Sequence, residues 1–455
     1  MKHVILGTML LVLPTTSAPA DTLWQAWQAA RANDPAYETA SAQLSAAATT
    51  RPTALAALLP HFVIAAGAGP QTQYLSQPQL DGLGFEPVTE HEHIGVSTWQ
   101  VTLNQTLFNW GALKTYQAAD SSVQSAAATY QATLESLTVT VVTDYVAVLA
   151  AEADLASLRA AAKGFAAQFR DAEALYRAGM AGVIGADEAG AAYQAIQIQV
   201  IQAQANLIAA RETLATLTGD VGLEPSGNLP QTVALPSLDT MDDWLARAQS
   251  GNPTLAAAEL MVAADSDLVS AAKGSYLPNI SLQLQHNNAA QGGTADFTLP
   301  GQNFAGSGNM VQQDNSVTVQ MTWNVFDGGA TRAAVDQAQA VQDQAVGNAA
   351  TARLAVVRMV RTDYYALILD NDRLKVANDA SNVAAQAVQS ATAGVRAGLI
   401  SESDLIADRQ LLLSAQIATH AAVVAIINDV TGLAQAAGSA TPSLVQTISS
   451  ALSTS

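Results

Sequence analysis

The amino-acid sequence predicts an α+β membrane protein, with strands that belong to a β-barrel and very long helices that form a rod or tube. Three observations lead to this fold class. The chain starts with a segment typical of export signals, and the rest is a tandem repeat with an offset of 218 to 219 residues. Each copy combines alternating strand patterns with long stretches free of proline.

The first 20 residues have the layout of a secretory signal. Lys2 and His3 give a short basic start, an apolar run follows over residues 4–13, and Ala18-Pro19-Ala20 has the small-residue pattern of a cleavage site. The run is too short to span a bilayer as a helix. A buried N-terminal helix is the alternative, but a proline directly after the run favours cleavage. We therefore expect a signal peptide over residues 1–20 and a mature chain that begins near Asp21.

Composition narrows the class of protein. The chain has 38 acidic and 19 basic residues, a net charge of −19, which argues against nucleic acid and against an electrostatic membrane-surface binder. It has no cysteine, so we expect no disulfide framework, no thiolate zinc site and no thiol-linked lipid anchor. No later stretch has about twenty uninterrupted apolar residues, so we expect no transmembrane helix. The remaining classes are a soluble periplasmic protein and an outer-membrane β-barrel.

A tandem duplication is the most informative feature of the sequence. Asp34-Pro35 and Asn252-Pro253 are 218 residues apart, whereas Thr143-Asp144-Tyr145 and Thr362-Asp363-Tyr364 are 219 apart. The other matched pairs are Leu59-Pro60 with Leu277-Pro278, Phe108 with Phe326, Gly111 with Gly329, Lys114 with Arg332, and Arg177-Ala178-Gly179 with Arg396-Ala397-Gly398. We predict a first strand-and-helix repeat over 21–235, a second over 236–435, and a flexible Ser/Thr-rich tail over 436–455.

Each copy is expected to begin with one helix, over residues 22–57 and 239–274, followed by two strands separated by a loop. The clearest strands are 280–284 and 317–325, because apolar and polar residues alternate there with a period of two. Their first-copy equivalents are near 62–72 and 99–103. A transmembrane barrel strand needs this alternation, but a half-buried strand of a soluble sandwich shows it too.

Long helices favour the membrane-channel alternative. Proline is absent from residues 88–224 and from residues 301–441, and we expect one continuous helix in each stretch, over 112–176 and 330–395. At 1.5 Å per residue each helix is about 100 Å long, far more than a compact domain needs. We expect return helices over 187–217 and 402–432. Gly219 and Gly432 would end them.

Four strands are too few to close a barrel, and open strand edges are not tolerated in lipid. The chain must therefore associate with further copies of itself if its strands span a membrane. The residues alone require two or more copies.

The duplicated order of helix, Leu-Pro pair, two strands, Phe-x-x-Gly, long helix, glycine turn and return helix resembles the TolC-like outer-membrane efflux proteins. The resemblance covers residues 21 to about 435. It implies a homotrimer with a 12-stranded outer-membrane barrel continued by a helical tube in the periplasm. Such a protein is a passive exit duct for small molecules or proteins in tripartite efflux or type I secretion. The implied partners are a periplasmic adaptor, an inner-membrane transporter of the ABC or RND type, and outer-membrane lipid, with no cofactor.

The resemblance also implies a closed periplasmic aperture lined by aspartates six and nine residues after the second turn glycine. Counted from Gly398, Asp404 has the first position, and Asp408 is one residue beyond the second. The two acids are one helical turn apart on one face. Ser401-x-x-Asp404 is also a capping-box pattern, which is the structural alternative. In the first copy Asp187 is the counterpart, with shifted spacing.

Two further features follow from the resemblance. The family's closing contacts use a tyrosine and an arginine at positions that here hold Val395 and Ile400, so another residue, such as Arg396 or Glu402, must substitute for them. The tips that would receive the adaptor contain Gly179 with Met180 and Gly398 with Leu399. An ordinary helix–helix turn needs the same glycines.

Enzymatic function is not expected. The sequence has no catalytic His, Ser or Cys constellation and no Walker-type loop. We place His91-Glu92-His93 on a solvated loop rather than in a metal site, and Gly292-Gly293, Gly301 and Gly306 in a second loop. Trp99, Trp110 and Trp323 suit an interfacial aromatic belt. A structural coiled-coil stalk is the alternative function, and the sequence does not identify the cargo.

Overall fold

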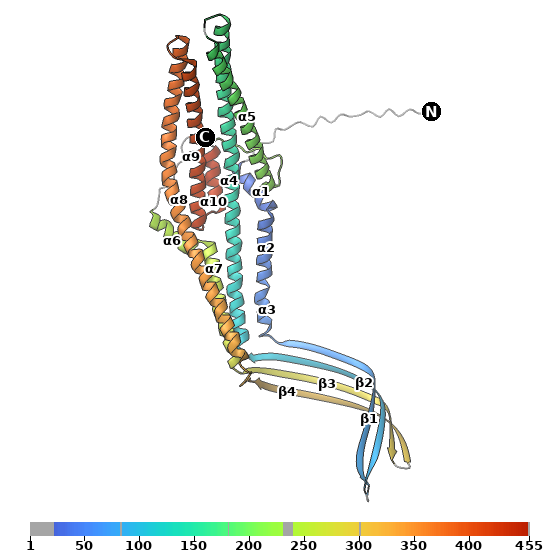
Figure 1. Ribbon diagram of the computed structural model, residues 1–455. Helices are drawn as coiled ribbons and strands as arrows, with labels where there is room; N and C mark the ends of the chain where they lie inside the picture. Colours follow the sequence, from blue (N-terminus) through green and yellow to red (C-terminus); the bar gives the residue numbers. More distant parts are fainter. Residues whose placement is uncertain (1–21, 82–83, 181, 231–239, 300–301, 454–455) are drawn as a thin grey trace, which may run out of the picture. The chain divides into compact units, whose positions relative to one another are not determined.

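The computed structural model describes residues 22–81, 84–180, 182–230, 240–299 and 302–453 (Figure 1). The predicted signal peptide and the boundary between the two repeats lie outside these residues. Within them, one order of elements occurs twice: short helices, two strands, one very long helix and a return helix.

The first copy contains seven elements. They are α1 (Leu23–Asn33), α2 (Pro35–Ala48), α3 (Thr50–Ala56), β1 (His61–Asp81), β2 (Gly84–Phe108), α4 (Trp110–Arg177) and α5 (Val183–Thr218). The second copy follows the same order, and the C-terminal segment adds α10. They contain α6 (Met241–Gly251), α7 (Pro253–Lys273), a 3₁₀ turn (Gly274–Tyr276), β3 (Asn279–Leu299), β4 (Gln302–Thr322), α8 (Ala330–Arg396), α9 (Glu402–Ala436) and α10 (Pro442–Ser453).

The prediction of one unbroken helix at the start of each copy is wrong. Asp34 and Asn252 have extended backbone and separate α1 from α2 and α6 from α7. Each side chain then accepts a hydrogen bond from a backbone N–H three residues on, at 2.7 Å for Asp34 and 2.9 Å for Asn252. Proline follows in both cases, at the first helical position, where its missing N–H costs nothing. The Asp-Pro and Asn-Pro pairs therefore start a new helix.

The four strands are much longer than predicted, with lengths of 21, 25, 21 and 21 residues. Two predicted loops are therefore wrong: His91 and His93 lie in β2, and the glycines 292, 293 and 306 lie in β3 and β4. Gly293 shows why these glycines suit a sheet. A Cβ at this position would lie 2.0 Å from the backbone oxygen of His93, so only glycine allows the two strands to approach so closely.

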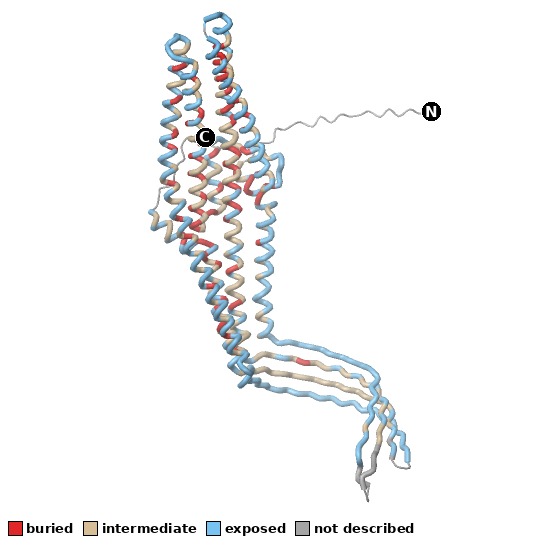
Figure 2. The backbone as a smooth tube through the Cα atoms, viewed as in Figure 1, coloured by how far each residue is buried: buried red, intermediate tan, exposed pale blue. Residues whose placement is uncertain are grey.

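The strands form one antiparallel sheet in the order β1-β2-β3-β4, which leaves β1 and β4 as edges. Phe62 and Leu284 both lie opposite Leu103, and Val317 lies opposite Leu284, so one sheet face carries a row of apolar residues. The opposite face in the neighbouring row is mostly polar, as the alternation predicts. Figure 2 shows β4 exposed along its whole length.

The two very long helices are confirmed: α4 has 68 residues and α8 has 67. Each is followed by a glycine with φ 69°, Gly179 or Gly398, in the left-handed region that favours glycine. Gly219 ends α5 with φ 72° as predicted. Gly432 does not end α9, which continues to Ala436.

The expected flexible tail is an ordered element instead. Pro442 begins α10, and the side chains of Val445 and Leu452 are buried. Both belong to the largest hydrophobic cluster, where α10 lies beside α1. A proline at the first helical position and apolar residues seven apart allow this Ser/Thr-rich segment to form an amphipathic helix.

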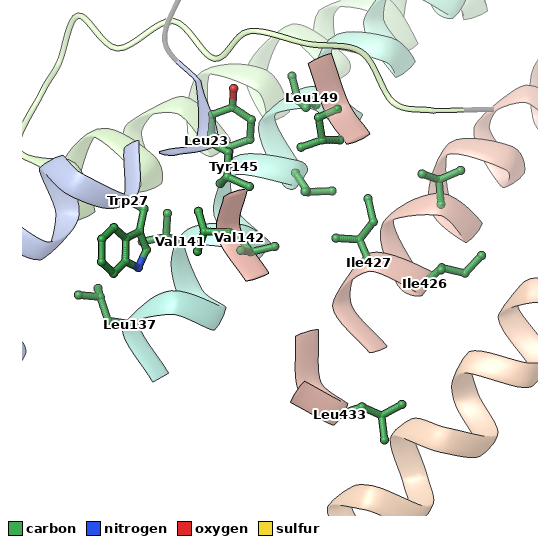
Figure 3. Packing of buried hydrophobic residues seen from close by; sticks show 14 of the residues in the cluster. Leu23, Trp27, Leu137, Val141, Val142, Tyr145, Leu149, Ile426, Ile427 and Leu433 are labelled. Atoms are coloured by element: carbon green, nitrogen blue, oxygen red, sulfur yellow. The ribbon is translucent and has the colours of Figure 1, made fainter. Parts of the chain in front are cut away.

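Two compact units divide the described chain, and each contains parts of both copies. One comprises the described residues within 22–42, 128–256 and 351–453, and the other comprises the described residues within 43–127 and 257–350. In the first, Figure 3 shows Trp27 and Tyr145 among aliphatic side chains of the core. Trp27 Nε1 donates to Thr138 Oγ1 at 3.1 Å, which satisfies its buried polar group.

Helices α4 and α9 each contain an 18-residue stretch that is apolar enough to cross a membrane by composition alone. Both helices contribute to the buried core, with Val141 and Val146 from α4 and Ile426 from α9. Length and composition are therefore weak indications of a membrane helix here.

Candidate functional site

The second turn, between α8 and α9, is closed by a capping box. Asp404 N donates to Ser401 Oγ at 3.2 Å, Ser401 N donates to Asp404 Oδ2 at 3.3 Å, and Ser401 Oγ donates to the same oxygen at 2.6 Å. The structural alternative predicted for Asp404 is thus realised. The residue remains exposed, and Asp408 lies one turn further along α9, partly buried. A carboxylate can cap its helix and still present charge to solvent.

The first turn, between α4 and α5, differs in its polar chemistry. Gly182 is the N-cap of α5, and no side chain caps this helix. The first turn of α5 contains no acid, whereas the first turn of α9 contains Glu402 and Asp404. Asp187 is exposed and lies one turn into α5. The structure therefore does not place it at the position that Asp404 has in the second copy.

Glu402 connects α9 to α4. Gln168 Nε2 donates to Glu402 Oε2 at 2.8 Å and to the Glu402 backbone oxygen at 3.1 Å. Gln168 is only 5% exposed, so this bond forms where water competes little for it. Among the residues that the structure describes, Gln168 Oε1 is buried without a partner. Glu402, one of the two residues suggested to replace the missing closing contacts, thus makes a bond between helices from different copies.

Arg409 makes a second contact between α9 and α4. A Cβ on Gly164 would lie 2.1 Å from Arg409 Nη1, so the guanidinium occupies the space that a side chain at 164 would take. Glycine inside a helix costs about 1 kcal/mol relative to alanine, so its presence in α4 needs a reason. Burial lowers the pKa of Arg409, and the nearby charge of Glu402 partly opposes that shift. Gly164 therefore admits a cation from the return helix.

A cavity of about 480 Å³ lies beside these contacts, between α4, α8 and α9. Its polar lining includes Gln168, Glu402 and Arg409, and Val395 and Arg396 contribute from the end of α8. The Cδ1 of Ile400 lies 2.6 Å from where a Cβ on Gly394 would be, so this side chain packs against the end of α8. At the two positions where the resemblance implies tyrosine and arginine, Val395 thus lines the cavity and Ile400 packs against Gly394.

The helix tips are exposed. Met180 is 73% exposed and Leu399 is 82% exposed, each directly after a turn glycine. An apolar side chain held in solvent at a fixed turn is suited to contact another protein.

Sequence reasoning missed Gln168, Gly164 and Arg409. Gly164 was the one detectable signal, since it interrupts an alanine-rich helical stretch. The histidines of β2 form ordinary strand contacts instead: the rings of His91 and Tyr74 are 4.6 Å apart, and His93 Nδ1 lies 3.5 Å from Thr72 Oγ1. Within the described ranges, no three His, Cys, Asp or Glu side chains group as metal ligands.

Comparison with known proteins identifies the class. The chain matches the family described as outer membrane efflux protein over residues 26–220 and 244–439. It is 26% identical over 341 residues to the alkaline protease secretion protein AprF of Pseudomonas aeruginosa, covering 73% of this chain and 67% of AprF. It is 21% identical over 343 residues to the outer membrane protein TolC of Vibrio cholerae, covering 75% and 73%. The solved outer-membrane channel OprN is similar in fold, with a TM-score of 0.73, 21% identity and 93% of each chain covered.

The chain belongs to the outer membrane efflux protein family. This membership confirms the predicted fold class, the outer-membrane location and the role as a TolC-like efflux and secretion channel. Members of the family are channel proteins rather than enzymes. The family match includes all four strands, which a coiled-coil stalk would not need.

Proposed function

We propose that three copies of this chain form one outer-membrane exit duct that performs no chemistry of its own. The observation that carries the proposal is the sheet with two long open edges, β1 and β4. Unpaired backbone groups cost several kcal/mol each in lipid, so the edges must pair with other chains. Three four-stranded sheets give a barrel of twelve strands, within the range of single barrels in outer membranes.

Apolar stripes on the helices support association between copies. Leu369, Val376 and Val383 recur every seven residues along α8, and all three are exposed. Ile201 and Ile208 repeat the same spacing on α5 and are exposed too. A seven-residue apolar repeat is typical of helices that pack side by side in coiled coils. In the trimer, helices of adjacent copies cover these stripes and close the tube.

The duct works with a periplasmic adaptor and an energised inner-membrane transporter of the ABC or RND type. The adaptor docks on the tips formed by Gly179 with Met180 and Gly398 with Leu399. Their exposed apolar side chains and fixed turns support this assignment. The relative AprF is a protease secretion protein, which supports proteins as well as small molecules as cargo.

The gate lies at the second turn. Asp404 and Asp408 from three copies line the periplasmic aperture as an acidic ring that binds cations, and Asp187 contributes less because of its different position. The α4–α9 contacts of Glu402 with Gln168 and of Arg409 with Gly164 hold the closed state. They replace polar contacts at positions 395 and 400, where this chain has valine and isoleucine.

Conductance of the purified full chain in planar lipid bilayers tests the duct directly. The expected result is discrete conductance steps from particles whose mass corresponds to three chains. Intact trimers that insert in the bilayer without conducting would contradict the proposal and would favour a structural stalk.

A further inference from the structure

A second cavity, of about 710 Å³, lies between α4, α5 and α9. All of its lining residues belong to one compact unit, and among the described residues it shares none with the cavity beside the second turn. The lining residues fall within 147–158, 199–210 and 417–428, mostly three or four positions apart, so one face of each helix borders the same space. The volume is in the range of sites that hold small organic molecules, roughly 300–1,000 Å³.

The wall of this cavity is mostly apolar and made of small side chains. Seven of its sixteen lining residues are alanine, so the helices leave open a space that larger side chains would fill. Leu158, Ile417 and Val424 add larger apolar surface. Such a wall suits the hydrocarbon part of a ligand, because contact there removes apolar surface from water on both sides.

One ionic pair interrupts the apolar wall. His420 Nδ1 of α9 lies 2.7 Å from Asp154 Oδ1 of α4, and both partly buried side chains line the cavity. An ionised carboxylate has only acceptors, so Nδ1 carries the hydrogen and donates it. A neutral imidazole in this arrangement orients the carboxylate and leaves its negative charge in place, and its other ring nitrogen, Nε2, is a further acceptor.

The cavity wall provides no strong cation to neutralise Asp154. Among the described residues that line it, none is lysine or arginine. Arg211 directly follows the lining residue Ala210, but its Nη2 is paired with Glu152 Oε1 at 2.7 Å, and neither member of that pair lines the cavity. The carboxylate of Asp154 is therefore the fixed charge that a bound molecule meets.

The cavity remains accessible if copies of the chain associate through the apolar stripe of α5. At about 100° per residue, Ile201 and Ile208 lie roughly 180° around the helix from the lining positions. Gln199 and Asn206, which line the cavity, are exposed, so it opens to solvent along α5. A neighbouring copy that covers the isoleucines thus leaves this opposite face free.

We propose that this cavity binds a lipophilic organic cation, one ion per chain. The apolar wall contacts the hydrocarbon body, and Asp154 attracts the positive charge. An organic anion of the same size is rejected, because it would place two like charges together in a partly buried position. The net charge of −19 adds long-range attraction for cations. The lining residues all come from one chain, so binding does not depend on the proposed duct.

Two ions of similar shape and opposite charge test the proposal: tetraphenylphosphonium, a cation, and tetraphenylborate, an anion. Each is titrated calorimetrically into the purified full chain in a neutral detergent. Ala421→Leu is the reference protein, because Ala421 lines the cavity and is exposed, so leucine fills the space without entering the core. Subtracting its heats removes uptake by detergent. We expect saturable binding of the cation, one per chain, and no remaining heat for the anion.

Asp154→Asn keeps the size of the side chain and removes its charge. It should weaken phosphonium binding about tenfold, a modest factor because solvent screens the attraction to a partly buried carboxylate. Asp171→Asn is the matched control, since it makes the same change at an exposed position of α4 outside this cavity. It should keep the wild-type affinity. Thermal unfolding of each variant checks that the protein is folded.

Three results would overturn the proposal. They are equal binding of the two ions after subtraction, wild-type affinity in folded Asp154→Asn, and equal phosphonium heats in wild type and Ala421→Leu. The last comparison decides the matter even if Asp154→Asn does not fold. None of these measurements involves conduction, so a negative result leaves the proposed duct intact.

Discussion

The two helical hairpins, α4–α5 and α8–α9, have nearly the same backbone but different polar chemistry. The long helices differ by one residue in length, as do the return helices, and both turn glycines have φ 69°. Yet the α8–α9 turn has a side-chain capping box that the α4–α5 turn lacks, and Glu402 and Arg409 of α9 contact α4 of the other copy.

This difference shows that two copies of a duplicated module can keep the same backbone and yet acquire different polar contacts. The backbone of both copies builds the wall of the tube, so lengths and turn glycines are retained in both. The charged contacts differ in place: Glu402 and Arg409 of α9 reach α4 of the other copy, whereas Arg211 of α5 pairs with Glu152 of α4 within the first copy, at 2.7 Å. The contacts that we propose for the gate therefore involve α9 and its partner α4.

The largest effect is expected on the free energy of unfolding, when a buried core side chain of α1 in the first copy is truncated. Trp27 is buried and hydrogen-bonded, whereas the residue 218 positions later, Leu245, is only half-buried. Trp27→Ala should destabilise the fold by about 3–5 kcal/mol, and Leu245→Ala by roughly 1–2 kcal/mol. Thermal unfolding of detergent-solubilised trimers measures both. Equal losses would mean that the two copies contribute alike to the core.

A smaller effect is expected at the contact between Arg409 and Gly164. Gly164→Ala should displace the guanidinium, and we expect the open fraction in planar bilayers to rise about tenfold, or roughly 1.4 kcal/mol. Gly347→Ala is the matched control, because it makes the same change inside α8 where a Cβ meets nothing within 4 Å. The control should stabilise its helix by up to about 1 kcal/mol without altering conductance. Equal conductance in both variants would remove Arg409 from the gate.

The smallest effect concerns the two tips. Gly398→Ala and Gly179→Ala each force φ near 69° on a residue with a Cβ, at a cost of about 1 kcal/mol. We expect a local change that weakens adaptor binding and leaves the conductance of the isolated trimer unchanged. Adaptor pull-down with both variants measures this. Undiminished binding and normal export would place the docking surface elsewhere.

Much of the fold could be predicted from the sequence because its signals are local. Proline-free alanine-rich stretches define α4 and α8 to within two residues, and the offset between repeated pairs gives the order of elements. Strand lengths could not be predicted, because glycine, asparagine and histidine in β2, β3 and β4 are typical of loops. They are tolerated because long neighbouring strands supply the hydrogen bonds.

The candidate site was only partly predictable. The capping box and Glu402 are visible as short-range patterns near Gly398. The pairs Gln168–Glu402 and Gly164–Arg409 join residues more than 230 positions apart, and no periodicity indicates such contacts.

The claim that the gate belongs to the second copy is tested most directly by cation block of single trimers in planar bilayers. Asp404→Ala with Asp408→Ala should relieve block by multivalent cations applied from the periplasmic side, because the acidic ring is removed. Asp187→Ala, the same change on the first copy, should leave block nearly unchanged. Relief by Asp187→Ala together with full block in the Asp404 and Asp408 variant would contradict the account.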